Sequence, residues 1–507
     1  SWSFVSQVST ADESSVVARA VAELDAASDA DAGALAQKES QWAGILDSEA
    51  YRHQRFVADA WCAAFVWPKQ PGPMADAAPT NELWRQLRDG QGQPPALTVK
   101  TVEELAEQYR FLHWHLAFPQ VFARGGFDVV LGNPPWERVK LQEQEFFAPR
   151  SDEIATAPNA AARKKLIAAL AEKDPLLWAD WCAASREAEG QSHLVRQSGR
   201  YPLCGKGDVN TYALFAEHNH AVLGPTGRAG FIVPTGIATD DTTKEYFSSL
   251  VERSELASFF SFENEEFVFP AVHHAFKFAL IGVDRSGRSG RADLVFFARQ
   301  VAALADPGRH FSLTPADFAT LNPNTRTCPT FRSRRDADIN LVLYRRAGLL
   351  WREDDPDGNP WGLRFMRMFD MANDSGLFTT RAALEATGWK LEGNHYCLGQ
   401  RRMLPLVEAK MVHHFDHRFG TYQGQTEAQD NQGKLPEFDA AAHADAQRLT
   451  HPYYWVESSE VSERLGDRWD RGWLLGWRDI CRSTDQRTVI ASLIPRAAVG
   501  HTTPLIF

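Results

Sequence analysis

Along the first 115 residues, apolar positions recur at three- and four-residue spacing, which is the period of an amphipathic helix. The pattern is clearest over residues 16–24 and 37–64, and residues 102–116 predict a further helix. Pro71-Gly72-Pro73 and the polar stretch 89–95 are typical of loops between such helices. We therefore expect residues 1–115 to form a helical segment without strands.

From Phe118 the pattern changes to short, continuous apolar runs, which are typical of buried strands. A helix is expected from Asp208, as its N-cap, to about Leu223, where Gly224-Pro225-Thr226-Gly227 ends it. Residues 137–207 are polar and predict an insertion, with its best helix at 160–171. Strands alternating with helices across short turns predict an α/β fold with a mainly parallel sheet. The strands are expected at 127–131, 228–234, 256–262, 276–283 and 293–297.

Beyond about residue 305 the pattern loosens into short elements with many aromatic residues and Gly, Asp and Asn turns. A chain of 507 residues is long enough for two to four domains. We therefore expect an α/β domain at 116–305, a connector at 306–350 and a mixed α+β domain at 351–507.

The most informative residues are Asn133, Pro134, Pro135 and Trp136, which directly follow the apolar run 127–131. The Asn133 carboxamide oxygen and the Pro134 carbonyl can both accept hydrogen bonds from an exocyclic amine. The two prolines fix φ and hold these acceptors still, and the aromatic ring offers a surface for stacking. The pattern predicts a pocket for a planar, amino-bearing group, such as an adenine flipped out of DNA. Asn-Pro also marks ordinary turns, so the match depends on its context.

Bulk composition narrows the class of protein. No apolar run approaches the length of a bilayer span, and the six cysteines show no CxxC spacing, which favours a reducing, cytoplasmic location without a membrane. The net charge of −11 is unusual for a DNA-binding protein, so binding of DNA would require a local basic surface. Local basic clusters do occur, at Arg326, Arg332, Arg334 and Arg335 and at Arg345, Arg346, Arg364 and Arg367.

The N-terminal sequence Ser1-Trp2-Ser3-Phe4 has no Met and no signal pattern, and we expect an excised fragment.

Taken together, these segments resemble the adenine-N6 DNA methyltransferases of the large type IIG-like and phage-defence (BREX or DISARM) kind. Residues 133–136 match the catalytic motif of that family, and 208–215 (DVNTYALF) resemble the helix that follows it. Residues 227–234 (GRAGFIVP) resemble the next strand, and Val268-Phe269-Pro270 the segment that contacts the flipped base. Residues 404–419 resemble the start of the target-recognition region, so the resemblance covers about 105–420.

The resemblance implies a Rossmann-like sheet that binds S-adenosylmethionine and transfers its methyl group to the N6 amine of a flipped adenine in double-stranded DNA. Asn133 and the Pro134 carbonyl would hold the amine, with Trp136 and Phe269 stacked on the two faces of the base. Tyr212 and Asp208 would border the base and cofactor pockets, although a core aromatic and an N-cap are equally good interpretations. Other restriction or phage-defence subunits are expected partners.

Two departures from the family pattern matter. Trp replaces the usual Tyr or Phe at position 136, which preserves a flat stacking surface. More seriously, no strand followed by a Gly-rich turn and an acidic residue precedes Asn133, as the cofactor site requires. We therefore expect an incomplete sheet, with residues 1–115 inserted between the cofactor half and the catalytic strand.

Several alternatives remain open. The same chemistry could act on cytosine N4, an RNA adenine or a protein glutamine, or the chain could be a non-catalytic DNA-recognition module. His413, His414, Asp416 and His417 look like metal ligands, but without an HExxH pattern we expect no metal.

Overall fold

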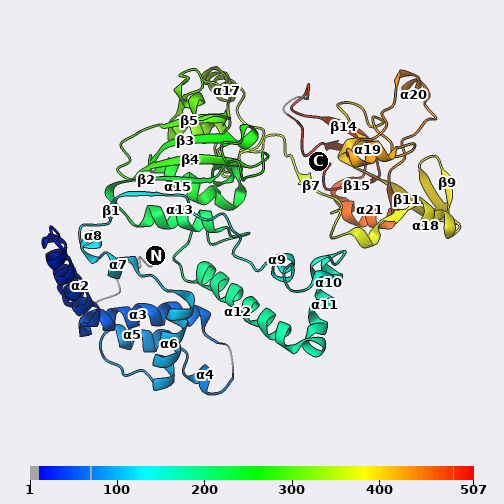
Figure 1. Ribbon diagram of the computed structural model, residues 1–507. Coiled ribbons are helices and arrows are strands. Elements are labelled where there is room, and N and C mark those ends of the chain that lie inside the picture. Colours follow the sequence, from blue (N-terminus) through cyan, green and yellow to red (C-terminus); the bar gives the residue numbers. More distant parts are fainter. Residues whose placement is uncertain (1–10, 69–70, 483–484) are drawn as a thin grey trace. The chain divides into compact units, whose positions relative to one another are not determined.

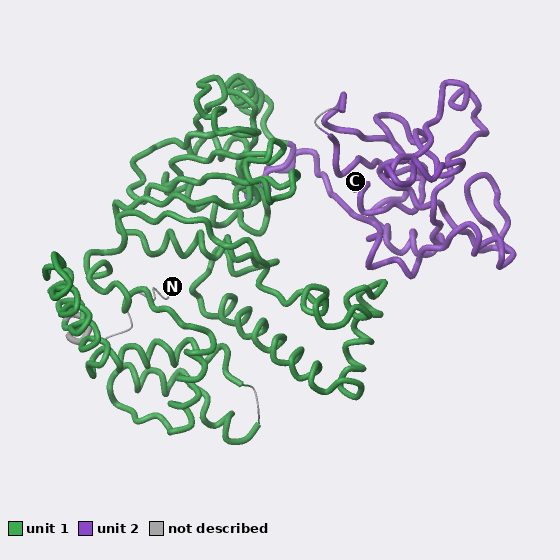
Figure 2. Tube along the Cα trace, in the orientation of Figure 1, with its two compact units in different colours: residues 1–349 green, residues 350–507 purple. Residues whose placement is uncertain are grey.

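The structure is a computed structural model that describes residues 11–68, 71–482 and 485–507. Residues Ser1–Phe4, interpreted above as a cut end, lie outside the described residues. The chain divides into two compact units, at residues 1–349 and 350–507 (Figure 2). Each unit has its own apolar core, and each is considered by itself below.

The described residues before the first strand are helical, as the apolar spacing predicts. Ser48 separates the second and third helices, because its side chain caps the Tyr51 amide and its own amide bonds back to Ile45. α3, α5 and α6 share one apolar core that includes Val57, Trp67 and Val102. The helices are α1 (Ala11–Ala26), α2 (Ala32–Asp47), α3 (Glu49–Val66), α4 (Pro73–Asp76), α5 (Asn81–Arg88), α6 (Ala96–Tyr109), α7 (Trp114–Ala117) and α8 (Pro119–Ala123).

The main sheet of the first unit has six strands in the order β1-β2-β4-β3-β5-β6 (Figure 1). Only the β1·β2 and β3·β5 pairs are parallel. The other pairs of neighbouring strands are antiparallel, so the expectation of a mainly parallel sheet is wrong for the pairing of neighbours. β4 runs antiparallel between β2 and β3, and as a result β1, β2, β3 and β5 all point the same way. The fold is a mixed α/β sheet. Its strands are β1 (Phe127–Gly132), β2 (Leu223–Pro234), β3 (Leu256–Glu263), β4 (Lys277–Asp284), β5 (Ala292–Ala298) and β6 (Phe311–Leu313).

Two adjacent glycines allow β1 to begin against β2. Gly126 has φ +125°, and a Cβ there would lie 2.5 Å from the Val222 carbonyl oxygen and 2.7 Å from the Gly224 nitrogen. Any side chain would therefore push the strands apart. Residues 224–227, expected to end a helix, belong instead to β2, which pairs with β1 from Leu223 to Phe231.

One face of the sheet carries the helices. α13 (Thr211–Ala221), α15 (Lys244–Glu252), α16 (Pro315–Leu321) and α17 (Arg334–Ala347) share its largest apolar core with alternate residues of the strands. The opposite face is more open. There, Val129 and Leu131 of β1 are 59% and 77% exposed.

Residues 306–349 are part of the first unit rather than a connector. β6 pairs with β5 from Ala292↔Leu313 to Leu294↔Phe311. Phe318 of α16 and Leu341 of α17 are buried in the same core as β3 and β5. The capping box at Thr314, which starts α16, is the local signal of this additional structure.

The expected insertion at 137–207 is helical and has a small core of its own around Phe147, Ile154 and Ile167. Its last helix contacts α3, where Gly190 lies against Val66. The insertion contains α9 (Glu143–Phe147), α10 (Asp152–Ala155), α11 (Ala160–Lys173) and α12 (Pro175–Gln197).

The second unit is mixed α+β with mostly antiparallel strands. One sheet has the order β8-β12-β11-β10-β9, and a second has the order β14-β13-β16-β7. Its core includes Phe369, Leu406, Val456 and Leu474. In the part of the chain that the structure describes, no helix combines the length and apolar character needed to cross a membrane. The strands of the two sheets are β7 (Phe365–Met366), β8 (Thr379–Thr380), β9 (Lys390–Glu392), β10 (His395–Leu398), β11 (Arg401–Val407), β12 (Tyr454–Glu457), β13 (Trp473–Trp477), β14 (Ala491–Pro495) and β16 (Leu505–Ile506), and the longest helix described in this unit is α21 (Ser458–Leu465).

The largely buried His218 on α13 makes the first unit sensitive to acid. Burial lowers its pKa to about 4, and the Arg200 guanidinium 3.3 Å from Nδ1 adds to this effect. In the unfolded chain His218 has a pKa near 6.5. Between that pH and about 4, the unfolded state therefore binds a proton that the folded state does not bind. The stability that neutral His218 gives is complete above about pH 6.5 and is lost as the pH falls toward 4.

We therefore expect His218→Gln to flatten the fall in melting temperature between pH 6.5 and 4.5, measured by differential scanning fluorimetry. Each such histidine contributes up to about 1.4 kcal/mol per pH unit in this window. His273→Gln, an exposed histidine in the same unit, is the control and should retain the wild-type slope. Equal slopes for wild type and His218→Gln would contradict the assignment.

Candidate active site at the carboxyl edge of the sheet

The carboxyl ends of β1, β2, β3 and β5 lie at one edge of the sheet, because these four strands share a direction. In open α/β sheets, ligands bind in the crevice outside this edge. The turn 133–136 follows β1, and the loop 264–272 follows β3. Segments more than 120 residues apart in the sequence are therefore brought to the same edge.

The turn after β1 presents its two expected acceptors. Asn133 is exposed, and Pro134 is buried beneath it. Neither the Asn133 carboxamide nor the Pro134 carbonyl forms a hydrogen bond with any residue that the structure describes. Trp136 is half-buried and packs against the apolar clusters on both faces of the sheet. Its indole nitrogen is buried and has no hydrogen-bond partner within the described chain.

Thr211, the first residue of α13, fastens this turn. Its hydroxyl lies 2.7 Å from the Pro135 carbonyl oxygen, to which it donates, and it accepts from the Glu137 amide at 3.0 Å. The Thr211 amide in turn donates to the Glu137 carbonyl at 2.8 Å. The sequence pattern indicates a role in the pocket for the neighbouring Tyr212 but not for Thr211, because a threonine at a helix start looks like an ordinary cap.

Asn264 fixes the loop that carries Phe269. It is fully buried, and its Nδ2 donates to the carbonyls of Phe269 at 3.0 Å and Val272 at 2.8 Å. Its Oδ1 accepts from the Phe269 amide at 3.0 Å. The sequence placed Asn264 in an acidic loop without a role. The only sequence feature that could have pointed to a role for Asn264 is that it is an amide among the carboxylates Glu263, Glu265 and Glu266.

Trp136 and Phe269 belong to the same apolar cluster. Phe269 packs edge-on to Phe278 with ring centroids 4.8 Å apart, and Phe278 stacks on Phe262 at 5.0 Å. Trp136 contacts this cluster from the β1 side. Both rings are half-buried against this cluster.

Tyr212 and Asp208 are placed differently from the turn. Tyr212 is only 6% exposed and lies within the core, where burial raises its pKa to about 12, with Asp240 adding to the effect. Asp208 is exposed and lies 3.8 Å from Arg138. It does not cap α13. Asn210 occupies the N-cap position, and its side chain makes no capping bond.

The residues present do not form a cradle for S-adenosylmethionine. Such a cradle needs a Gly-rich turn between a parallel strand and a helix. Of the strands that end at the carboxyl edge, β2 is followed by the single Gly236, whose Cβ position lies 2.3 Å from Asp240 Oδ2. The turns after β1 and β3 begin with Asn133 and Asn264. Among the described residues, this edge therefore holds the turn 133–136 without a Gly-rich turn after β1, β2 or β3.

The histidines at 413–417 do not form a helix face. The His413 amide donates to the Asp416 carbonyl in a tight turn, and the Asp416 carboxylate pairs with His443 at 2.9 Å. Across the described ranges, no cluster of three or more His, Cys, Asp or Glu side chains is arranged to hold a metal ion. All six cysteines are free thiols.

Residues 72–166 match the family of Eco57I restriction-modification methylases. The matched segment is less than a fifth of the chain, but it includes the turn 133–136. No curated protein matches the chain.

Three solved structures show low similarity to this chain. They are the ATP-dependent Type ISP restriction-modification enzyme LlaBIII bound to DNA (10% identity, TM-score 0.26, 59% of this chain and 17% of that one), the type IIG restriction endonuclease BpuSI (11%, 0.23, 91% and 65%) and DrdV in a DNA complex (10%, 0.22, 98% and 63%). This chain thus spans less than two thirds of the length of each.

The isosteric change Asn264→Asp tests how the Phe269 loop is held. The variant keeps an acceptor for the Phe269 amide but loses the two donated bonds and places carboxylate oxygens against two carbonyls. A loss of about 2 kcal/mol of local stability corresponds to about 30-fold faster hydrogen exchange at the Phe269 amide.

Exchange is measured by mass spectrometry on peptides covering residues 264–276. Asn81→Asp, the same change at an exposed position on α5, is the control and should leave exchange in this loop unchanged. Wild-type exchange in Asn264→Asp would show that the three hydrogen bonds do not hold the loop.

Proposed function

We propose that this chain carries the base-binding and catalytic residues of a DNA adenine-N6 methyltransferase. The observation that carries the proposal is the turn after β1, where the Asn133 and Pro134 oxygens are both unpaired within the described chain and lie next to the Trp136 ring. The match of residues 72–166 to restriction-modification methylases supports it.

The chemistry follows from the two acceptors. Adenine N6 carries two N–H bonds, and Asn133 Oδ1 and the Pro134 carbonyl oxygen accept one each. Accepting both draws the nitrogen toward tetrahedral geometry and makes its lone pair available to an electrophilic methyl group. The proline rings and the Thr211 clamp hold the acceptors in place, so little reorganisation is needed at the moment of reaction.

Trp136 and Phe269 hold the base between them in this proposal. A base must leave the duplex to reach the turn, and aromatic stacking compensates for part of the lost stacking energy, at about 1–3 kcal/mol per contact. In this proposal Tyr212 supports the pocket and Asp208 borders it. Tyr212 is buried in the core, and Asp208 pairs with Arg138. The methyl donor is S-adenosylmethionine, and the described residues supply only the base side of the site.

The biological setting is a restriction-modification system or a phage-defence system of the BREX or DISARM kind. Double-stranded DNA is the substrate, and residues 351–507 begin the region that recognises the target sequence. Other subunits of such a system are the expected partners, in the cytoplasm.

The test is methyl transfer from tritiated S-adenosylmethionine to unmodified DNA by the full-length natural protein. We expect label in N6-methyladenine after digestion to nucleosides and chromatography. Asn133→Ala removes one of the two acceptors, and the rate should fall about 10²- to 10³-fold. The control is Asn81→Ala, the same change at an exposed position on α5, which should keep the wild-type rate.

Other outcomes would replace the proposal. Label in N4-methylcytosine, in RNA or in a protein glutamine would keep the site but change its substrate. DNA binding without any transfer by the wild-type protein would favour a non-catalytic recognition module, for which the missing cofactor cradle already provides an argument. Equal rates for Asn133→Ala and wild type would remove Asn133 from the chemistry.

A further inference from the structure

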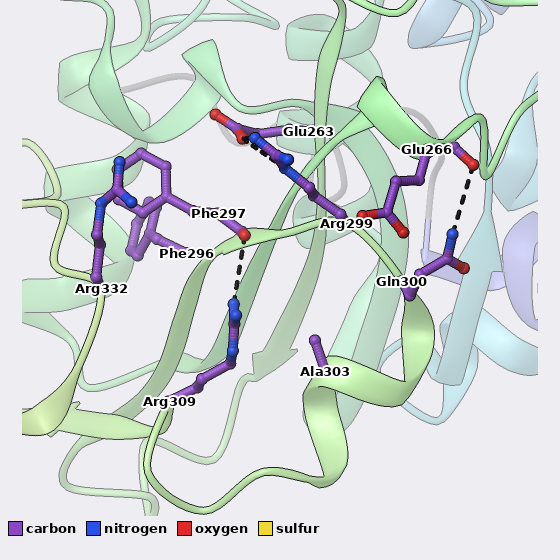
Figure 3. Close-up of a pocket in the computed structure, with 9 residues that line it drawn as sticks. All are labelled: Glu263, Glu266, Phe296, Phe297, Arg299, Gln300, Ala303, Arg309 and Arg332. Atoms are coloured by element: carbon purple, nitrogen blue, oxygen red, sulfur yellow. Dashed lines mark hydrogen bonds and ion pairs between the residues drawn. The ribbon is translucent and has the colours of Figure 1, made fainter. Parts of the chain in front are cut away.

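A cavity opens at the same edge of the sheet as the turn 133–136. It has a volume of about 560 Å³ and lies at the carboxyl ends of β3 and β5 (Figure 3). Ala303 lines it and also packs against the apolar cluster that contains Trp136 and Phe269. The cavity and the proposed base pocket are therefore neighbours across one shared cluster.

Most charges around this cavity are already balanced. Glu263 accepts from Lys277 at 3.2 Å and from Arg299 at 3.4 Å. Arg309 lies 3.9 Å from Asp306 and donates to the Phe297 carbonyl at 3.4 Å. Arg332 is different. Its guanidinium lies over the Phe297 ring, 5.0 Å from the centroid, and no described carboxylate pairs with it.

Phe297 provides an unusual platform for Arg332. Its φ is +58°, a left-handed conformation that costs a residue with a side chain about 1–3 kcal/mol. Because of this turn, Phe297 leaves the strand alternation and contacts the helix-covered core, while Ala298 belongs to the cluster on the other face. The Arg309 bond to its carbonyl helps to hold this geometry. Such strain is concentrated at ligand-binding positions.

The neighbouring arginines of the basic cluster are used elsewhere or lie outside the cavity. Arg326 is ion-paired with Glu252, and Arg334 and Arg335 occupy the exposed first turn of α17. Arg332 is therefore the member of the cluster at 326–335 that faces the cavity (Figure 3). A guanidinium held flat on an aromatic ring keeps its edge N–H groups available for phosphate oxygens.

We propose that Arg332, assisted by Arg309, binds a backbone phosphate of the DNA strand that carries the flipped base. The inference rests on the proposed function, because the strand is placed by the base at Asn133 and Trp136. Glu266 also lines the cavity. The contact gives a chain with net charge −11 a local cation where the strand leaves the base pocket.

The experiment measures binding of a fluorescently labelled 30-bp unmodified duplex to the full-length protein between 50 and 200 mM KCl. Loss of one phosphate contact lowers the slope of log Kobs against log salt by about one. For Arg332→Ala we expect this reduced slope and about tenfold weaker binding at the lowest salt concentration. Arg332→Lys keeps the charge without the planar fork, and it should restore the slope and part of the affinity.

Arg334→Ala and Arg335→Ala are matched controls that remove the same charge outside the cavity, and both should bind within twofold of wild type. Wild-type affinity and slope for Arg332→Ala would overturn the inference, as would absence of DNA binding by the wild-type protein. Calorimetric titration with inorganic phosphate provides another arm. Free phosphate binding that depends on Arg332, with unchanged DNA binding, would replace the DNA strand by a small anion.

The two proposals fail separately. Asn133→Ala should lower methyl transfer about 10²- to 10³-fold but keep the wild-type salt slope, because it removes no positive charge. No methyl transfer by the wild-type protein, with a reduced slope for Arg332→Ala, would overturn the methyltransferase and retain the phosphate contact.

Discussion

The parallel pairing of β1 with β2 is the constraint on which the rest of the site depends. It places the turn 133–136 at the carboxyl edge of a sheet whose other parallel-pointing strands end in the Asn264 loop and the Phe297 cavity. Gly126 makes the pairing possible, because the β2 backbone occupies the space that a side chain there would need. The position of the turn 133–136 thus depends on Gly126, which is not itself part of the site.

The three-residue β6 was missed, because it lies in the segment expected to be a connector. The other five strands of the first unit were predictable because their apolar runs are continuous and end at Gly, Pro or polar residues. Their order was not. β4 returns antiparallel between β2 and β3, and nothing in its apolar letters distinguishes that position from a parallel one. The N-cap at Asp208 was wrong because α13 begins at Thr211, whose amide and hydroxyl bond to the chain after β1. The helix end at 224–227 was wrong for another reason. Pairing with β1 extends β2 through a stretch that would otherwise form a turn.

The candidate site divides in the same way. The residues 133–136 could be found from their own chemistry, since two prolines beside an amide and an aromatic ring form a rare combination. Thr211 and Asn264 could not, because their importance lies in bonds to backbone groups that are distant in the sequence or hidden in a loop. Arg332 was visible only as one member of a charge cluster. It differs from Arg326 because Arg326 is paired with Glu252, and from Arg334 because Arg332 lines the cavity and Arg334 does not.

The two halves of this edge stabilise their side chains by different means. On the β1 side, fixed φ angles and the Thr211 clamp hold two oxygen acceptors that have no partner in the described chain, which suits recognition of an amine. On the β5 side, the Arg332 guanidinium lies over the ring of Phe297, which has a positive φ. No described carboxylate pairs with Arg332, and this suits binding of an anion. Asn133 and Arg332 are both exposed, so water satisfies these groups until a ligand replaces it. Their occurrence at one edge, joined by the Trp136–Phe269 cluster, matches a nucleotide, whose base offers N–H donors and whose backbone offers negative charge.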